Sequence, residues 1–178
     1  MYGQRTGEPG LKSPSVDRTQ QRQSSAERVR AALAANGVPA MRLKEFAEST
    51  ATAVDAAAAI GTSVGRIVKS LVFMAADRPI LVLASGPNRV DVHKIAALVG
   101  QPIVRANADQ VRELTGFAVG GVPPIGHKQP LTTLVDRDLL EYDEVWAAAG
   151  TPNSVFPIDP RDLVRITAGS VADVAQTA

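Results

Sequence analysis

The sequence contains no cysteine in 178 residues, which excludes disulfides, thiolate nucleophiles and cysteine-based metal sites. Histidine is nearly absent too: His93 and His127 are the only two, far apart and without the spacing of a ligand pair. We therefore expect no metal site. No apolar run approaches membrane-spanning length, and the N-terminal stretch lacks the apolar segment of a secretory signal. The simplest expectation is a cytoplasmic protein without a membrane partner.

Aromatic residues are also few, and the net charge is close to zero. The chain has four Phe, two Tyr and one Trp, so a broad base-stacking platform is not expected. Its 19 basic and 18 acidic residues give a formal charge of +1, whereas proteins that wrap a long duplex carry a strong basic stripe. This balance favours binding of a small ligand or of a short nucleic-acid end.

Composition divides the chain into two parts. Residues 1–23 are rich in Gly, Pro, Ser, Gln and Arg, which predicts a disordered tail or a remnant of an expression vector. Residues 24–178 have the usual length of one domain, long enough to bury roughly two-thirds of the surface of the unfolded chain. We therefore expect a single folded unit after the tail.

Capping residues and hydrophobic periodicity predict interleaved helices and strands. Helices are expected after the capping residues Ser24, Asp91 and Asn107 and over the alanine-rich segment Thr52–Ile60, with a last helix or turn from Asp159. Strands are expected, one of them short, at Met41–Phe46, Ile67–Met74, Ile80–Ala84, Leu131–Val135, Val145–Ala149 and Ser154–Ile158. The irregular order predicts an α/β domain of the α+β type. Its helices would flank a curved mixed sheet, not a doubly wound parallel one.

The most informative segment is Gly116–Gly126, which is followed by His127 and Lys128. It is too apolar for a surface linker and too rich in glycine and proline for a helix or a central strand. Glycine lets a ligand or another backbone come close, while Pro123 and Pro124 stiffen the chain and remove two amide donors. This glycine–proline loop fits a docking surface for a ligand, and a tight apolar turn between strands fits equally well.

Lys69 stands out within a run of branched apolar residues. Because strand side chains alternate, Lys69 shares a face with Leu71 and Phe73, and the opposite face is apolar as well. An ammonium group there is costly unless it meets an anion or the mouth of a cleft. The alternative is a lysine whose long side chain reaches water from the end of the strand.

Several familiar sites are excluded or disfavoured. Gly121–Gly126 superficially resembles a phosphate-binding loop, but His127 stands where lysine is required. No Gly-x-Ser-x-Gly motif occurs, and a serine–histidine–acid triad has no obvious members. The acidic run Asp136–Glu144 is more typical of a solvated turn and helix face than of paired catalytic carboxylates. Ala148–Asn153 offers small residues, a hydroxyl and an amide, although a plain turn is the favoured interpretation.

Three motifs occur in a fixed order: Ile67–Phe73 with its Lys69, then Gly120–Gly126, then Ala149-Gly150-Thr151. Together they resemble the YbaK/ProX-like family, also known as the prolyl-tRNA synthetase-associated editing domain. Each motif alone is weak, and the ordered set is fairly specific. The resemblance runs from about Ser24 to Ala175, essentially the whole predicted domain.

The resemblance implies a curved mixed, barrel-like sheet and an activity: hydrolysis of the ester between a wrong amino acid and the 3′ end of tRNA. It implies that Lys69 pairs with the phosphate of the terminal adenosine and that Gly120 presents backbone to the substrate. The residues it places around the aminoacyl group are Gly121, Pro124, Gly150, Thr151 and Asn153. The implied partner is the acceptor end of an aminoacyl-tRNA, with a synthetase as a further possible partner, and no cofactor is implied.

Two departures from the family pattern bear on which amino acid fits. Pro123 replaces a small polar residue, and Pro152-Asn153 stands where some members carry histidine. The edited amino acid and the tRNA therefore stay open. Two other functions also stay open: a non-catalytic module that binds a tRNA acceptor end or a nucleotide and associates with a synthetase, and a structural or regulatory domain with an inactive pocket.

Overall fold

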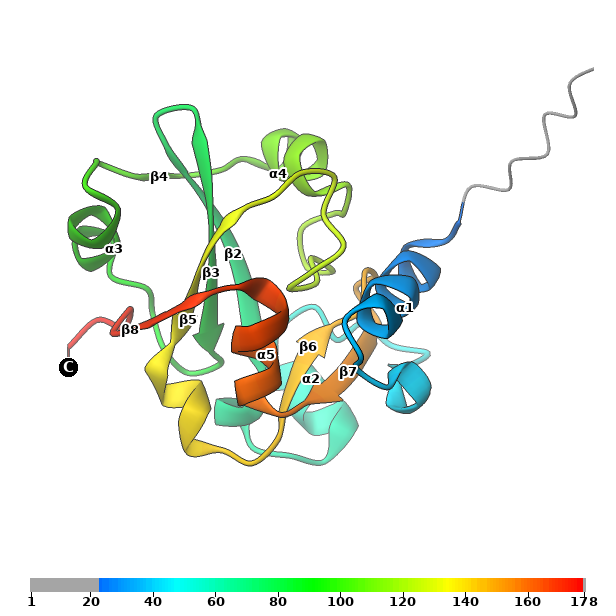
Figure 1. The fold of residues 1–178 in the computed structure, drawn as a ribbon. Coiled ribbons are helices and arrows are strands. Elements are labelled where there is room, and N and C mark those ends of the chain that lie inside the picture. The colour runs from blue at the N-terminus through cyan, green and yellow to red at the C-terminus, as the bar shows by residue number, and fades with distance from the viewer. Residues whose placement is uncertain (1–22, 178) are drawn as a thin grey trace, which may run out of the picture.

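The computed structural model describes residues 23–177, so the predicted tail lies outside the described residues except for Gln23. Within that range the chain forms five α-helices, three short 3-10 helices and two β-sheets (Figure 1). The helices are α1 (Ser25–Ala35), α2 (Ala53–Ile60), α3 (Val92–Val99), α4 (Ala108–Thr115) and α5 (Pro160–Thr167), with the 3-10 turns η1 (Ala40–Arg42), η2 (Val64–Arg66) and η3 (Arg137–Glu141). The strands are β1 (Lys44–Glu45), β2 (Val68–Ala75), β3 (Arg78–Ser85), β4 (Val104–Arg105), β5 (Thr132–Asp136), β6 (Val145–Ala148), β7 (Ser154–Ile158) and β8 (Ser170–Ala172).

The predicted capping residues define the helix starts. Ser24 and Glu27 cap each other's backbone at the start of α1, and Asn107 and Gln110 do the same at α4, with both bonds 2.9 Å long. These bonds satisfy amide groups that have no partner inside the helix. The α2, α3 and α4 helices each end on a glycine in the left-handed conformation, which glycine adopts at little cost.

The two sheets differ in their strand directions. The larger sheet has the order β4-β2-β3-β5-β8, with β3–β5 and β5–β8 parallel and the other pairs antiparallel. The smaller sheet is antiparallel, with the order β1-β7-β6. The sheets meet at one bridge between Ile67 and Trp146. The mixed α/β prediction is confirmed, and within the described residues the strands form two sheets in place of a closed barrel.

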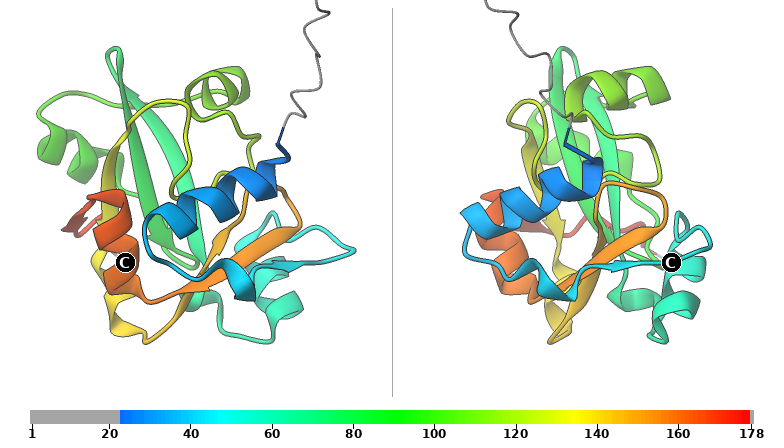
Figure 2. Two further views of the ribbon diagram at one scale, coloured as in Figure 1. Left: turned by 45° about the vertical axis from the view of Figure 1, so that its right-hand side comes forward. Right: turned by 90° about the vertical axis from the view of Figure 1, so that its right-hand side faces the viewer.

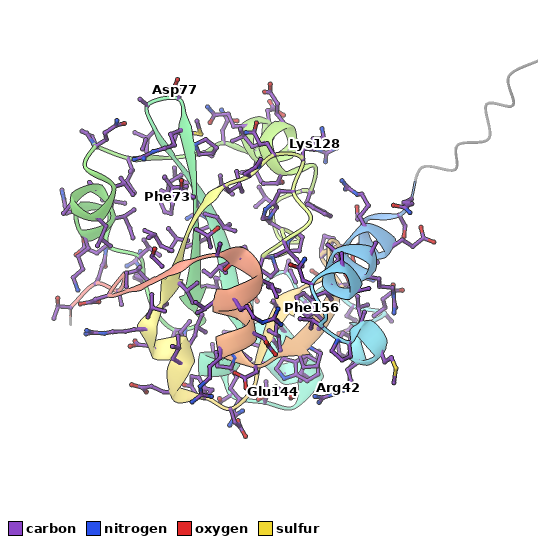
Figure 3. All side chains as sticks on the ribbon, in the orientation of Figure 1. Arg42, Phe73, Asp77, Lys128, Glu144 and Phe156 are labelled. Carbon is purple, nitrogen blue, oxygen red and sulfur yellow. The ribbon has the colours of Figure 1, made fainter. Side chains whose placement is uncertain are left out.

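One predicted strand is mostly absent. Only Lys44–Glu45 of the segment Met41–Phe46 pairs as a strand, and its beginning falls in η1. Met41 is 90% exposed, so the weak alternation in this segment reflects no buried face. Arg42 instead pairs with Glu144 at the surface (Figure 3).

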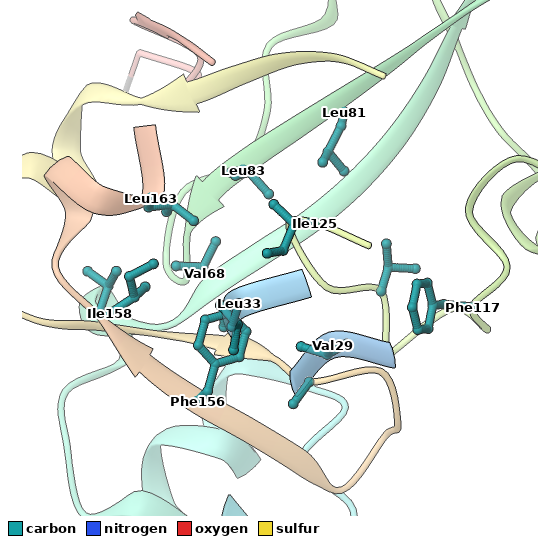
Figure 4. Packing of buried hydrophobic residues seen from close by; sticks show 14 of the residues in the cluster. Val29, Leu33, Val68, Leu81, Leu83, Phe117, Ile125, Phe156, Ile158 and Leu163 are labelled. Atoms are coloured by element: carbon teal, nitrogen blue, oxygen red, sulfur yellow. The ribbon is translucent and has the colours of Figure 1, made fainter. Parts of the chain in front are cut away.

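Alternate side chains of β3 support two separate hydrophobic clusters. Leu81 and Leu83 face a cluster that includes Leu33 of α1 and Leu163 of α5 (Figure 4). The intervening residues of β3 face a second cluster, which includes Ile95 of α3. Full burial of such side chains stabilises the fold by roughly 1.5–3 kcal/mol each. The expectation that this strand pair is covered on both faces is therefore confirmed.

A third cluster positions α2 beside the smaller sheet. Ala56 and Ala57 of α2 pack against Trp146 and Val155, on the strands β6 and β7. The views in Figures 1 and 2 show α2 next to these strands and close to the start of β2. This packing fixes the start of α2, the first half of β2 and the smaller sheet around one space.

Candidate functional site

A cavity of about 300 Å³ occupies that space. Its walls come from the segment that starts α2, the first half of β2, the glycine–proline loop and the strands β6 and β7. Lys69 and Gly120, which lie 51 positions apart in the sequence, both line it. The structure therefore brings together the two residues to which the sequence assigned catalytic roles.

Lys69 is partly buried on the wall of this cavity. Its ammonium group donates a hydrogen bond to the backbone carbonyl of Asn88, and no ion pair among the described residues includes it. Desolvation lowers the pKa of Lys69 from its ordinary value, Arg105 and Arg89 lower it further, and Asp136 opposes the change. A desolvated ammonium without a carboxylate partner is a strong candidate for binding an anion.

The acidic run departs from its prediction at Asp136, which is buried. The carboxylate of Asp136 accepts hydrogen bonds from the backbone amide of Ser85 at 3.0 Å and from Asn88 Nδ2 at 2.8 Å. Asp136 thus holds Asn88, whose carbonyl in turn binds Lys69. Its role is to position the lysine's immediate partner, whereas Glu141 and Asp143 are exposed as expected.

The peptide backbone at Gly120 is exposed to the cavity, and its conformation disfavours any residue with a side chain. Its φ is +89°, and a Cβ there would lie 3.1 Å from the Cβ of Ala51. Such a φ is uncommon for residues other than glycine, and the contact is tighter than ordinary van der Waals packing. Gly120 therefore keeps the wall opposite α2 bare.

The next residue, Gly121, packs against another segment of the backbone and does not line the cavity. A Cβ on Gly121 would lie 2.7 Å from the carbonyl carbon of Thr151. The glycine–proline loop therefore packs directly on the turn that follows β6. Of the diglycine pair, Gly120 lines the cavity and Gly121 contacts the supporting turn.

The other predicted pocket residues do not line this cavity. Thr151 Oγ1 donates to Asn153 Oδ1 at 2.9 Å, and Asn153 Nδ2 donates to the carbonyl of Phe46 at 2.7 Å. A Cβ on Gly150 would lie 2.8 Å from the carbonyl of Ser25, so this glycine permits close packing on α1. These contacts make the turn a support for the loop, and substrate contact by its residues stays a prediction.

Pro124 lies on a separate surface hollow together with His127. His127 Nε2 lies 2.7 Å from the carbonyl of Pro123, and the His127 ring meets Phe117 edge to face. Burial lowers the pKa of His127, so the neutral ring donates to that carbonyl. Arg28 of α1 stacks over Phe117 at 4.2 Å. These contacts pack the loop against its own side chains and against α1.

Several residues that line the cavity were not predicted from the sequence to be site residues. Thr50 and Ala51 line the cavity just before α2, where the amide of Thr50 donates to the carbonyl of Pro152 at 2.6 Å. Trp146 also lines it, and its position as the single tryptophan within a predicted strand was an available signal. Arg105 gave no local signal, because only the pairing of β4 with β2 brings it to the site.

Ser70, also on the cavity wall, has a buried hydroxyl with no hydrogen-bond partner among the described residues. A buried polar group without a partner costs about 1–3 kcal/mol. We therefore expect Ser70→Ala to raise the free energy of unfolding by about 1 kcal/mol, measured by urea denaturation.

Ser85→Ala is the matched control for this measurement. The buried Ser85 hydroxyl donates to the carbonyl of Gly65 at 2.7 Å, so its removal leaves that carbonyl unpaired. We expect the control to lower the free energy of unfolding by about 1–2 kcal/mol. Equal destabilisation by both substitutions would show that the Ser70 hydroxyl is satisfied in solution.

Across residues 23–177, no three His, Cys, Asp or Glu side chains are grouped in a way that holds a metal ion. Over the same range, none of the helices combines the length and the apolar character needed to cross a bilayer.

Known proteins resemble this chain in both sequence and fold. The model of the aminoacyl-tRNA editing domain family matches residues 47–166, a range that contains both Lys69 and Gly120. A solved structure described as a candidate trans-editing enzyme for prolyl tRNA synthetase has a TM-score of 0.83 and 48% identity, over 87% of this chain and 99% of that one.

Two curated relatives cover most of the domain. YwhH of Bacillus subtilis (strain 168), a protein of uncharacterised function, is 35% identical over 120 residues, which span 67% of this chain and 76% of YwhH. EbsC of Enterococcus faecalis (strain ATCC 700802 / V583), a candidate Cys-tRNA(Pro)/Cys-tRNA(Cys) deacylase, is 27% identical over 134 residues. That match spans 73% of this chain and 82% of EbsC.

Proposed function

Because the chain belongs to the aminoacyl-tRNA editing domain family, we propose that it is a trans-acting deacylase that hydrolyses the ester bond of mischarged tRNA. The observation that carries this proposal is the shared cavity of Lys69 and Gly120. One wall offers a desolvated ammonium group and the other offers bare peptide. The candidate activities of EbsC and of the structural relative support the same reaction class.

In the proposed complex, Lys69 binds the phosphate of the terminal adenosine, and the backbone at Gly120 contacts the aminoacyl ester. Water attacks the ester carbonyl, the bond between carbonyl carbon and ribose oxygen breaks, and the ribose oxygen takes up the proton. The products are the free amino acid and uncharged tRNA. Fixed donors aimed at the developing oxyanion are typically worth about 10²–10³ in rate.

Among residues 23–177, no imidazole, carboxylate or thiol lines the cavity. An aminoacyl ester is already activated, so the reaction needs no nucleophile from the protein. We therefore assign the uptake of the water proton to the substrate, whose own ribose hydroxyl is close to the carbonyl. In this mechanism the chain acts by holding the substrate and excluding bulk water.

The size and lining of the cavity limit which amino acid side chains it can accept. About 300 Å³ is at the small end for ligand sites, and Ala56, Ala148 and Val155 supply apolar wall. These features favour a small uncharged side chain, such as that of alanine, serine or cysteine. Binding at a synthetase's own site separates amino acids that differ by one methylene by only roughly 10–200-fold. A separate editing site is therefore needed to remove such amino acids after they have been attached to the tRNA.

The direct test is a panel of mischarged tRNAs, beginning with tRNA(Pro) carrying alanine, serine or cysteine. We expect the protein to accelerate ester loss from at least one member while leaving Pro-tRNA(Pro) intact. The measurement is the fraction of labelled amino acid that stays on the tRNA over time. Binding of uncharged tRNA without turnover of any ester would instead favour the non-catalytic module.

A further inference from the structure

A second groove, of about 460 Å³, runs along β2 beside the cavity. Lys69, Leu71 and Arg105 line both spaces, so the groove and the cavity adjoin at these side chains. Arg89 and Val92 complete its sides near the start of α3. The groove and the cavity therefore lie side by side at Lys69.

Of the residues that the structure describes, three cations and no carboxylate line the groove. Arg89 and Arg105 are exposed, and neither side chain takes part in an ion pair or hydrogen bond recorded among the described residues. The nearby carboxylate of Asp136 lies beneath the surface, where Ser85 and Asn88 occupy it. With a formal charge of only +1 for the whole chain, this cluster is a local concentration of positive charge.

Beside the groove, the exposed edge of β2 also offers backbone amide and carbonyl groups to a ligand. The carbonyl of Val72 accepts from the amide of Ala106 on the β4 side, so the peptide groups of Ser70, two residues earlier, face that side too. Within residues 23–177, pairing on this edge is limited to β4 at Phe73 and Met74 and to the bridge at Ile67. The intervening peptide groups are free to contact a ligand.

We propose that this groove binds the single-stranded 3′ end of the tRNA upstream of its terminal adenosine, with Arg89 and Arg105 on the two preceding phosphates. The inference rests on the proposed function, which places the terminal adenosine and its phosphate at Lys69. Guanidinium groups bind phosphate oxygens through paired hydrogen bonds, and phosphate contacts fix register without selecting sequence. The apolar side chains of Leu71 and Val92 offer a floor for sugars and base faces.

A substrate-truncation experiment tests the assignment. The variant is Arg89→Ala/Arg105→Ala, and the control is Arg161→Ala, an exposed arginine on α5. One substrate is the mischarged tRNA, and the other is the same aminoacyl ester on adenosine 5′-monophosphate, which keeps the phosphate for Lys69 but lacks the upstream nucleotides. We expect the double variant to lower kcat/KM for the tRNA about 10–100-fold, mainly through KM. Its kcat/KM for the nucleotide ester stays within about twofold of the parent value.

Equal losses on both substrates, or no loss on the tRNA, would overturn the groove assignment and leave the deacylase proposal standing. If no ester is hydrolysed, a binding measurement can still test the groove assignment. Fluorescence anisotropy with the labelled RNA 5′-ACCA-3′ is expected to show weaker binding by the double variant, with a salt slope reduced by roughly 0.7 per arginine. Unchanged affinity and slope would reject the groove independently of catalysis.

Discussion

Replacing Lys69 with alanine is expected to lower kcat/KM for the mischarged tRNA by about 10²–10³-fold, in the range found when one preorganised donor is removed from an active site. The ammonium group is desolvated and makes no ion pair among the described residues, so its charge is available to a substrate phosphate. Single-turnover hydrolysis of the labelled substrate measures the loss. A variant that cleaves as fast as the parent would remove Lys69 from the mechanism.

Two further substitutions separate this role from folding and from general surface charge. The pKa of Lys69 is lowered in the fold, so its charged form favours the unfolded state at pH values below the folded pKa. Lys69→Met removes both this desolvated charge and the hydrogen bond to the Asn88 carbonyl, so its free energy of unfolding is expected to stay within about 1 kcal/mol of the parent at neutral pH while activity is lost. Lys128→Ala removes an exposed lysine beside the glycine–proline loop, outside the cavity (Figure 3), and is expected to retain full activity.

The sequence predicted the elements whose signals are local. Capping boxes at Ser24 and Asn107 and glycine stops defined helix ends, because these bonds form within a few residues. The dense apolar runs of β2 and β3 predicted a strand pair covered on both faces for the same reason. Lys69 and Gly120 were placed by the ordered motifs, and the fold brings them to one cavity.

Features that depend on contacts between distant segments were not predictable in this way. Asp136 is buried only because Ser85 and Asn88 supply donors from another part of the chain. Arg105 reaches the site through a two-residue strand whose own sequence carries no chemical motif. The close packing of Gly150 on α1 likewise depends on a contact between distant segments, while substrate contact by this turn stays a prediction.

Gly120→Ala is expected to lower kcat/KM by about 10²-fold, comparable to the loss of one oxyanion donor, because it moves the peptide wall of the cavity. The new methyl group would lie 3.1 Å from the Cβ of Ala51, on the opposite wall. The left-handed backbone adds a stability cost of about 1–2 kcal/mol for a residue with a Cβ. Hydrolysis of the labelled tRNA and urea denaturation, measured on the same preparations, report the two effects.

Gly37→Ala isolates the backbone cost, because Gly37 has a φ of +71° and nothing lies within 4 Å of its hypothetical Cβ. This control should lose similar stability and keep full activity. Adding Ala51→Gly to Gly120→Ala removes the facing methyl group, so the double variant should recover activity without recovering the stability lost to backbone strain. Such coupling is expected only for residues in contact. Equal activity loss in Gly37→Ala, or no recovery in the double variant, would mean that Gly120 acts through overall stability and not through the shape of the cavity.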